Sequence, residues 1–327
     1  MNRVLLHTLL SRNGLNGLWE LLRLSVRRKL PAMSGYRPEI YYGQIDAGKR
    51  LEFRTAANPL VTIVVPVHNN WDLTYSCLYS VLLNTHGISY EVIVADDASG
   101  DETKNITGHI GGIKVVRNEE NLGFLRTCNR ASREARGEYL LFLNNDTNVQ
   151  HGWLKGLLDL FENDDSVGVA GSKLVYPDGR LQDAGGIVWN DGNCWIYGRW
   201  DDPQKAKYNE AKEMDYVSGA CILVRRQLWE EIEGFDERYS PAYYEDADLA
   251  LEARRRGFKV MYGPGSVVVH FEGVTCGRDV KKGTKRYQEI NREKFFAKWQ
   301  EVLKRDYAAP GTIRPWRDGR KGGVNVG

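Results

Sequence analysis

Residues 60–97 read LVTIVVPVHNNWDLTYSCLYSVLLNTHGISYEVIVADD, and they indicate how the chain folds. The stretch opens with a short run of β-branched residues that ends at Pro66, and residues 90–95 form a second such run. Between the two runs, apolar residues recur at helical spacing over residues 72–83. A strand, a helix and a second strand in this order are typical of a parallel βαβ unit whose strands are buried on both faces.

The same alternation continues toward the C-terminus. We expect further helices over residues 103–110 and 123–135, and further strands over residues 113–117 and 139–143. Strands and helices that alternate in this way predict the α/β class, with a doubly wound, mainly parallel sheet. In open sheets of this kind, ligands bind at the carboxyl ends of the strands.

Three polar groups directly follow predicted strands: His68-Asn69, Asp96-Asp97 and Asn145-Asp146. Because the carboxyl ends of parallel strands meet at one edge of the sheet, we expect these groups to converge there. The two adjacent acids, followed by small polar residues, suit hydrogen bonds to a nucleotide base and to ribose hydroxyls. A loop that uses Asp and Ser only to form a turn explains the same residues, and both interpretations stay open.

Asp146 and His270 are candidate metal ligands. Asp146 follows the most apolar strand of the chain, and a carboxylate fixed at a strand end can bind a divalent cation whose other ligands are phosphate oxygens. His270 ends the apolar run of residues 267–269, and a neutral imidazole is the commonest nitrogen ligand of metals. The alternatives are an Asx turn for Asp146 and a structural role for His270.

A helix is predicted to start near Glu245 and to run to about Arg256, with Gly257 as its stop signal. Three acids lie at the start of this helix: Glu245, Asp246 and Asp248. Helix capping explains them in part, and Asp248 is the best placed to accept hydrogen bonds from the backbone amides of the first turn. Glu245 is expected just before the helix. The aromatic residues that precede these acids would desolvate a carboxylate and raise its pKa, which a general base requires, and Asp246 is our candidate.

Composition narrows the function classes. The 327 residues are 42% hydrophobic and 27% charged, as in an ordinary globular protein, and a net charge of +2 predicts no nucleic-acid partner. The five cysteines are an odd number without a CxxC pair, which excludes a zinc ribbon. We interpret them as reduced thiols of a cytoplasmic protein, most of them buried.

The first 30 residues are rich in leucine, arginine and lysine at roughly helical spacing. Two alternatives fit this pattern: a helix that packs on the main domain or on another subunit, and a basic amphipathic helix that lies at the inner face of the cell membrane. The Pro, Gly and mixed charges of residues 31–58 predict a connector with little regular structure. No apolar run is long enough to span a bilayer, and no secretory signal is recognisable.

Residues from about 60 to 275 resemble family 2 glycosyltransferases of the GT-A fold. The resemblance rests on short motifs that occur together in the family's order. They are VVPVHN at residues 64–69, DDAS at 96–99, NLGF at 121–124, GEYLLFLNND at 137–146, SGA at 218–220, GFDE at 234–237, EDADL at 245–249, and His270.

The resemblance implies a role for individual residues. Asp97 would contact the nucleotide base, Pro66 and His68 would line the same pocket, and Asp96 would lie beside the ribose. Asn145 and Asp146 match the end of the family's DXD motif, whose last acid binds Mg²⁺ or Mn²⁺, and Asn144 replaces its first acid. His270 matches a position that completes the metal site in some relatives. Asp246 matches the catalytic base, and Glu245 would orient it or bind acceptor hydroxyls.

The resemblance also implies an activity and a domain plan. The chain would be an inverting, metal-dependent hexosyltransferase that uses a UDP- or dTDP-linked sugar and a glycan or lipid-linked glycan acceptor, as in bacterial O-antigen synthesis. The domain would span residues 59–275, with a nucleotide-binding half (59–150) and an acceptor half (151–275). Residues 1–58 would precede it, and a C-terminal helix and basic tail (276–327) would follow.

Two segments are candidates for the acceptor side. Residues 184–200 are rich in Gly, Trp and Tyr and either line the acceptor groove or pack internally. Residues 291–299 predict a basic amphipathic helix that closes over the site. Two other function classes remain as alternatives: a sugar-nucleotide pyrophosphorylase, whose glycine-rich loop is missing after Pro66, and a non-catalytic carbohydrate-binding module, which would be expected to lack Asp146 or Asp246.

Overall fold

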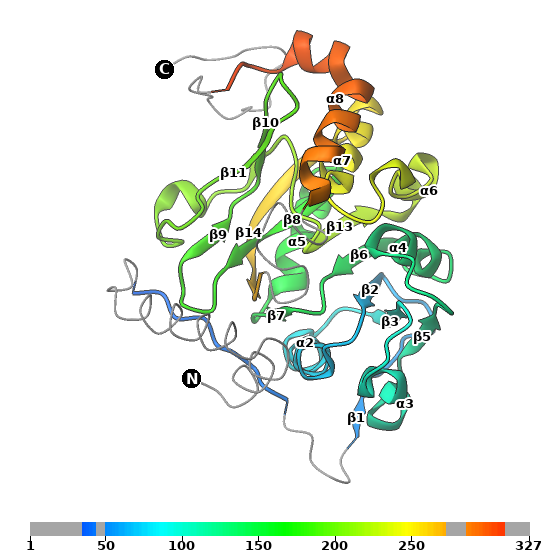
Figure 1. The fold of residues 1–327 in the computed structure, drawn as a ribbon. Helices are drawn as coiled ribbons and strands as arrows, with labels where there is room; N and C mark the ends of the chain where they lie inside the picture. The colour runs from blue at the N-terminus through cyan, green and yellow to red at the C-terminus, as the bar shows by residue number, and fades with distance from the viewer. Residues whose placement is uncertain (1–34, 44–49, 273–285, 311–327) are drawn as a thin grey trace, which may run out of the picture.

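The computed structural model describes residues 35–43, 50–272 and 286–310, which form a mixed α/β fold (Figure 1). Its centre is a ten-stranded sheet. The strands of this sheet are β2 (Val61–Val67), β3 (Tyr90–Asp96), β5 (Lys114–Arg117), β6 (Tyr139–Leu143), β7 (Thr147–Val149), β8 (Val167–Val175), β9 (Leu181–Asp183), β12 (Lys212–Glu213), β13 (Cys221–Arg225) and β14 (Lys259–His270). Their order is β12-β14-β8-β13-β6-β2-β3-β5, with β7 attached to β14 and β9 to β8.

The central sheet is mainly parallel, which confirms the predicted fold class. Strands β5, β3, β2 and β6 are parallel neighbours, and β8 and β14 form a second parallel pair. Strand β13 lies between β6 and β8 and is antiparallel to both, so the two parallel groups point in the same direction. The carboxyl ends of all these parallel strands therefore face one edge of the sheet.

Helices cover both faces of the sheet. They are α2 (Trp71–Asn84), α3 (Ile106–His109), α4 (Phe124–Ser132), α5 (Trp153–Asn163), α6 (Arg226–Ile232), α7 (Glu245–Arg255) and α8 (Tyr287–Asp306). Side chains alternate along the strands, so that Val92 and Val94 of β3 belong to the hydrophobic cluster that includes residues of α2 and α5, whereas Ile93 and Ala95 belong to the cluster that includes residues of α4, α6 and α7. Two small sheets complete the fold: β1 (Leu51–Glu52) with β4 (Ile110–Gly111), and β10 (Gly186–Val188) with β11 (Cys194–Ile196).

Within the described residues, the predicted helices and strands are present, with ends that differ by a few residues. The predicted helix over residues 103–110 is a 3₁₀ turn (Glu102–Asn105) followed by α3, and Glu245 is the first residue of α7 rather than the residue before it. The thiols of Cys77, Cys128 and Cys221 are buried and free, as expected, and Cys194 is half-buried.

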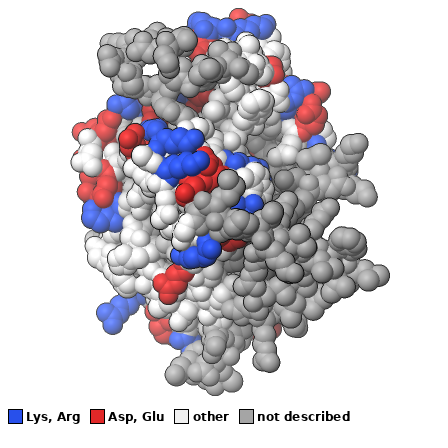
Figure 2. All heavy atoms as spheres, turned by 90° about the vertical axis from the view of Figure 1, so that its left-hand side faces the viewer, with Lys and Arg blue, Asp and Glu red and all other residues white. Residues whose placement is uncertain are grey.

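Several predictions concern residues outside the described ranges, namely the N-terminal segment 1–30, Cys276 and the basic tail from residue 314. None of the described helices combines the length and the apolar character that crossing a membrane requires. On the face of the molecule shown in Figure 2, the described Lys and Arg side chains are interspersed with Asp and Glu side chains.

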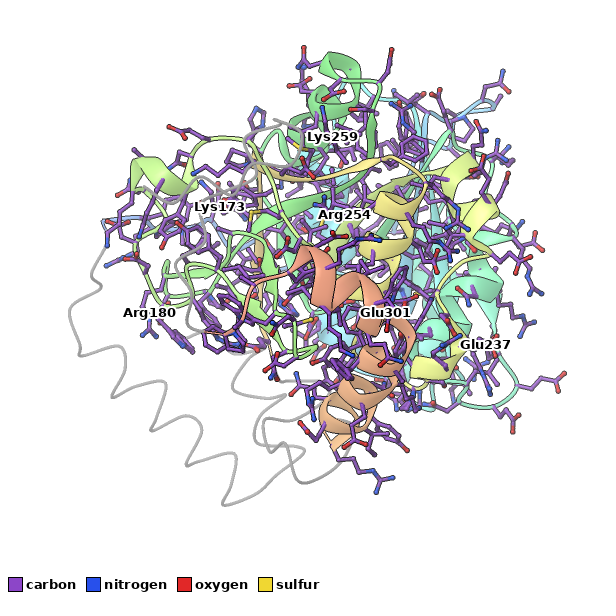
Figure 3. All side chains as sticks on the ribbon, turned by 90° about the horizontal axis from the view of Figure 1, so that it is seen from above. Lys173, Arg180, Glu237, Arg254, Lys259 and Glu301 are labelled. Carbon is purple, nitrogen blue, oxygen red and sulfur yellow. The ribbon has the colours of Figure 1, made fainter. Side chains whose placement is uncertain are left out.

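Helix α8 packs alongside α7, as the view from above shows with Glu301 of α8 and Arg254 of α7 labelled (Figure 3). Asp248 joins the two helices: its carboxylate accepts hydrogen bonds from Trp299 Nε1 (2.7 Å), Lys298 Nζ (2.7 Å) and the Tyr239 hydroxyl (2.9 Å). The prediction that Asp248 caps its own helix is therefore wrong. The side chain points to α8, where two donors, together with the Tyr239 hydroxyl, offset the cost of burying the charge of a residue that is only 2% exposed.

Candidate active site

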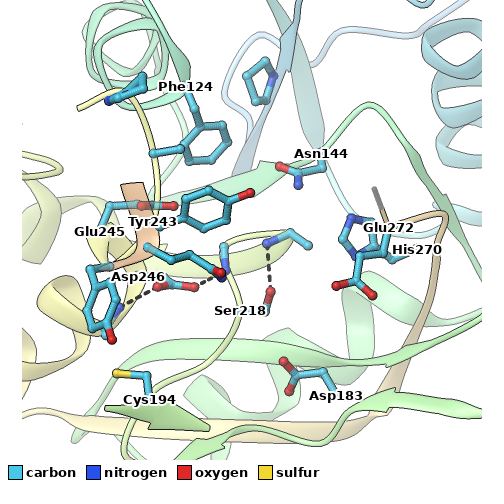
Figure 4. A pocket seen from close by; sticks show the side chains of 18 of the residues that line it. Phe124, Asn144, Asp183, Cys194, Ser218, Tyr243, Glu245, Asp246, His270 and Glu272 are labelled. Atoms are coloured by element: carbon cyan, nitrogen blue, oxygen red, sulfur yellow. Dashed lines mark hydrogen bonds between the residues drawn. The ribbon is translucent and has the colours of Figure 1, made fainter. Parts of the chain in front are cut away.

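A cavity of about 870 Å³ opens at the carboxyl edge of the sheet (Figure 4). Its lining includes His68 after β2, Asp97 after β3, and Asn145 and Asp146 after β6. Segments from the second half of the chain also line it, with residues of the β10–β11 hairpin, the start of α7, the end of β14 and α8. The predicted convergence of the polar groups that follow β2, β3 and β6 is confirmed.

Pro66, His68 and Asp97 line one end of the cavity. The His68 ring is fixed by two contacts: Nδ1 donates to the Asp97 carbonyl oxygen (2.6 Å), and Nε2 accepts from the Asn69 side-chain amide (3.1 Å). Asp97 Oδ1 accepts from the Asn118 side-chain amide and the Leu122 amide, and among the described residues only the Gly123 amide donates to Oδ2 (2.9 Å). A carboxylate has about four acceptor positions, so Asp97 keeps one for a ligand.

Asp96 is the one predicted nucleotide contact that the structure does not bring into the cavity. Its side chain is 1% exposed and is absent from the cavity lining. Oδ2 forms an ion pair with Arg117, and Oδ1 accepts from the Ser99 amide (2.9 Å). Both carboxylate oxygens thus hold the loop after β3 in place, which the sequence does not reveal because it does not show where Arg117 points.

Asp146 and His270 line the cavity in contact with each other, Asp146 from the segment between β6 and β7 and His270 from the end of β14. Asp146 Oδ1 lies 3.3 Å from His270 Nε2, and His270 Nδ1 contacts Gln182 Oε1 (2.9 Å). Burial lowers the pKa of His270, but the Asp146 carboxylate, together with the charges of Glu272 and Asp183, outweighs this effect and the pKa is raised overall. Asn145 lines the cavity beside them and donates its side-chain amide to Thr74 Oγ1 (2.9 Å).

The chemistry of this pair fits a divalent cation. A carboxylate oxygen and an imidazole nitrogen, which are both accepted by Mn²⁺, converge at 3.3 Å from separate strands. The Gln182 contact fixes the ring orientation, as partners of metal-bound histidines do. No cluster of three or more His, Cys, Asp or Glu side chains suited to a metal occurs among the described residues, so further ligands would have to come from a bound substrate.

Glu245 and Asp246 begin α7 at the opposite wall of the cavity. They directly follow Tyr243 and Tyr244, whose backbone is in the left-handed region (φ 77° and 74°), a strained conformation for bulky residues. Asp246 Oδ2 accepts from the Gly219 amide (3.1 Å), and Oδ1 accepts from the Ala247 amide (2.8 Å). Strain of this kind is typical of functional sites, where the surrounding structure holds it in place.

Burial raises the pKa of both acids, and for Glu245 the charge of Asp246 adds to the effect. The prediction that the surroundings of these acids raise a carboxylate pKa is confirmed. Glu245 is 8% exposed, and no described residue donates to its Oε2. Asp246 is half-buried and lines the cavity, so its carboxylate can reach a ligand there.

Asn291 of α8 fixes the backbone that presents these acids. The side-chain amide is fully buried and donates to the carbonyl oxygens of Tyr239 (2.6 Å), Ala242 (2.9 Å) and Tyr243 (3.0 Å). Helix α8 also contributes Arg292 to the cavity lining. The predicted C-terminal helix is present and closes one side of the cavity.

Sequence reasoning did not single out two residues that line the cavity. Asp183, at the end of β9, is 3% exposed. Trp195, in β11, is 50% exposed, whereas Trp189 of the same hairpin is buried, so residues 184–200 both pack internally and line the cavity. The aromatic content of the loop was the available signal for Trp195, and no signal marked Asp183.

Comparison with known proteins indicates the same protein family as the sequence motifs do. A family model described as glycosyl transferase family 2 matches residues 62–233. The O-antigen biosynthesis protein RfbC of Myxococcus xanthus is 28% identical to this chain over an aligned region that covers 70% of the chain. An N-acetylglucosaminyl-diphospho-decaprenol L-rhamnosyltransferase of Mycobacterium tuberculosis is 26% identical over 58% of this chain and 68% of its own length.

Some relatives are much longer than this chain, which spans 19% of RfbC and 29% of the y4gI protein of Sinorhizobium fredii. Among solved structures, that of GalNAc-T7 with UDP, GalNAc and Mn²⁺ superposes with a TM-score of 0.59 at 18% identity, over 75% of this chain and 50% of that one. This likeness shows a shared GT-A fold.

Proposed function

The chain belongs to glycosyl transferase family 2, and we therefore propose that it is an inverting, metal-dependent hexosyltransferase. In this proposal the donor is a sugar linked to UDP or dTDP, and the acceptor is a hydroxyl of a glycan or lipid-linked glycan. One observation carries the proposal: a carboxylate with a raised pKa, Asp246, lines the same cavity as the Asp146–His270 pair.

The nucleotide would bind at the end of the cavity formed by Pro66, His68 and Asp97. The acceptor position left open on Asp97 suits an N–H group of a nucleotide base. The rigid contacts of His68 and Asp97 favour a preformed pocket, because little side-chain freedom is left to lose on binding.

Asp146 and His270 would hold Mg²⁺ or Mn²⁺ against the diphosphate of the donor. The metal would neutralise charge that develops on the leaving diphosphate. Three features support this assignment: the convergence of the two side chains, the orienting contact from Gln182, and the presence of Mn²⁺ with UDP in the GalNAc-T7 structure.

Asp246 would act as the general base. An acceptor hydroxyl oxygen forms the new bond to the anomeric carbon while the bond from that carbon to the diphosphate oxygen breaks, and Asp246 takes the hydroxyl proton. Attack from the side opposite the leaving group inverts the anomeric configuration. Asp248 is a poor candidate for the base because its carboxylate is turned toward α8 and away from the cavity lining.

The acceptor would enter between the β10–β11 hairpin and α8. Trp195 offers an exposed aromatic face there, which suits stacking on a sugar ring. The names of RfbC and of the rhamnosyltransferase favour an acceptor in bacterial surface-polysaccharide synthesis. Residues 1–30 would then dock the protein on the membrane that carries a lipid-linked acceptor.

Two other function classes are less well supported. The family match argues against a sugar-nucleotide pyrophosphorylase. A non-catalytic carbohydrate-binding module would have no need of Asp146 and Asp246, and both line the cavity.

Calorimetric titration with UDP, dTDP and GDP tests the proposal. In the presence of MnCl₂ we expect one of these nucleotides to bind clearly more tightly than the others. Replacing MnCl₂ with EDTA should weaken that binding at least tenfold, because the metal offsets the diphosphate charge. Binding that is equally tight in EDTA, or no binding of any nucleotide, would contradict the proposed function.

A further inference from the structure

Asp183 is a buried carboxylate that points into the cavity, where Figure 4 shows it below His270 and Glu272. It ends β9, next to Leu174 of β8 in the sheet. Oδ1 accepts from the Gly185 amide (2.6 Å), and no other described residue donates a hydrogen bond to this side chain. The carboxylate therefore has acceptor positions that no described residue occupies, in a side chain that lines the cavity.

The described residues give this carboxylate no ion-pair partner. No Lys, Arg or His among the described residues forms an ion pair with Asp183, although its side chain is only 3% exposed. Burial raises the pKa of Asp183 to about 7, against the lowering effect of the Gly185 amide, and the charge of Asp246 adds to the rise. A buried acceptor of this kind is stabilised by a ligand that brings its own O–H or N–H donor.

The position of Asp183 indicates which part of a substrate it meets. It lines the same cavity as Asp246 and His270. Under the proposed function, His270 holds the diphosphate end of the donor and Asp246 holds the attacking hydroxyl. The sugar rings lie between these two points, and sugars carry hydroxyl donors.

We propose that the free oxygen of Asp183 accepts a hydrogen bond from a hydroxyl of a sugar bound beside the reacting centre, so that Asp183 helps to determine which sugar the protein accepts. This inference rests on the proposed function. It assigns Asp183 a recognition role that neither Asp246, the base, nor Asp146, the metal ligand, fulfils.

The substitution Asp183→Asn tests the inference because it is nearly isosteric. The Asn side-chain oxygen can still accept from the Gly185 amide, whereas the cavity-facing acceptor becomes an NH₂ group. The matched control is Asp215→Asn, since Asp215 is also a buried carboxylate that accepts from a backbone amide of the β10–β11 hairpin, that of Val188 (2.9 Å), but does not line the cavity.

Binding and turnover are measured with MnCl₂, the preferred nucleotide, and its sugar conjugates, taken from UDP-GlcNAc, UDP-glucose, UDP-galactose, dTDP-rhamnose and GDP-mannose. Octyl glycosides of the same sugars serve as acceptors. We expect Asp183→Asn to leave the affinity for the nucleoside diphosphate unchanged. The Kd of the sugar nucleotide or the KM of the acceptor should rise about 10- to 100-fold, as the loss of a hydrogen bond to a charged group implies.

The two substrates distinguish the source of the hydroxyl. A weaker sugar-nucleotide affinity and slower hydrolysis without acceptor assign Asp183 to the transferred sugar, and a rise confined to the acceptor KM assigns it to the acceptor. If Asp183→Asn matches Asp215→Asn in every parameter, or lowers only kcat, the inference is wrong. If the unaltered protein binds no sugar nucleotide, the proposed function itself fails.

Discussion

Asp246→Asn is expected to lower kcat for sugar transfer by about 10²–10⁴-fold, because a general base contributes that much to the rate. The affinity for Mn²⁺ and the nucleoside diphosphate should not change, since Asp246 lies in the first turn of α7, on the side of the cavity opposite His270 (Figure 4). An interaction that is made only in the transition state affects kcat without weakening ground-state binding. Steady-state transfer rates and calorimetric titration of the same preparation measure the two quantities.

Asp248→Asn is the matched control, because it removes a negative charge from the same helical turn. Its carboxylate contacts Tyr239, Lys298 and Trp299, so we expect lower stability but a kcat close to that of the unaltered protein. A near-native rate for Asp246→Asn combined with an inactive Asp248→Asn would overturn the assignment of the base.

The pH dependence of sugar transfer gives a second test of this assignment. Burial raises the pKa of Asp246, and a general base must be deprotonated to act. As the pH is lowered, the transfer rate should therefore begin to fall at a pH above the range in which ordinary carboxylates are protonated.

Asp146→Ala is expected to weaken Mn²⁺-dependent binding of the nucleoside diphosphate by about 100-fold or more, since a metal contributes several kcal/mol of charge stabilisation at such sites. His270 alone would offer one neutral nitrogen to the cation. Calorimetric titration with and without MnCl₂ measures the loss.

Asp178→Ala serves as the control for this loss, because Asp178 is a carboxylate outside the cavity that pairs with Arg180. It should bind the nucleotide like the unaltered protein. Unchanged affinity of Asp146→Ala in the presence of Mn²⁺ would refute the assignment of the metal site.

Much of the nucleotide side of the cavity was predictable from the sequence. The β-branched runs that became β2 and β3, and the polar residues that follow them, are local features, and the rule for parallel strands brings their ends together. His68, Asp97 and Asp146 therefore appear where they were expected. The raised pKa of Asp246 was also foreseeable, because the aromatic residues directly precede it in the sequence.

The remaining features depend on contacts between distant segments. Asp248 turns toward α8 because Lys298 and Trp299 lie there, a contact that spans about 50 residues of chain. Asp183 ends a three-residue strand in a glycine-rich segment, where no periodicity signals burial. The apolar run that forms β13 indicates a buried strand but not its direction, because an apolar run alone carries no orientation.

The anomeric configuration of the first product tests the central claim most directly. The unaltered protein would be incubated with MnCl₂, the preferred sugar nucleotide and an octyl glycoside, and the new glycosidic bond would be identified by its NMR carbon–hydrogen coupling. One base and direct attack on the donor predict a configuration opposite to that of the donor. A product that retains the donor configuration would contradict the account, because retention through two displacements requires a carboxylate that attacks the sugar rather than a base that takes the hydroxyl proton.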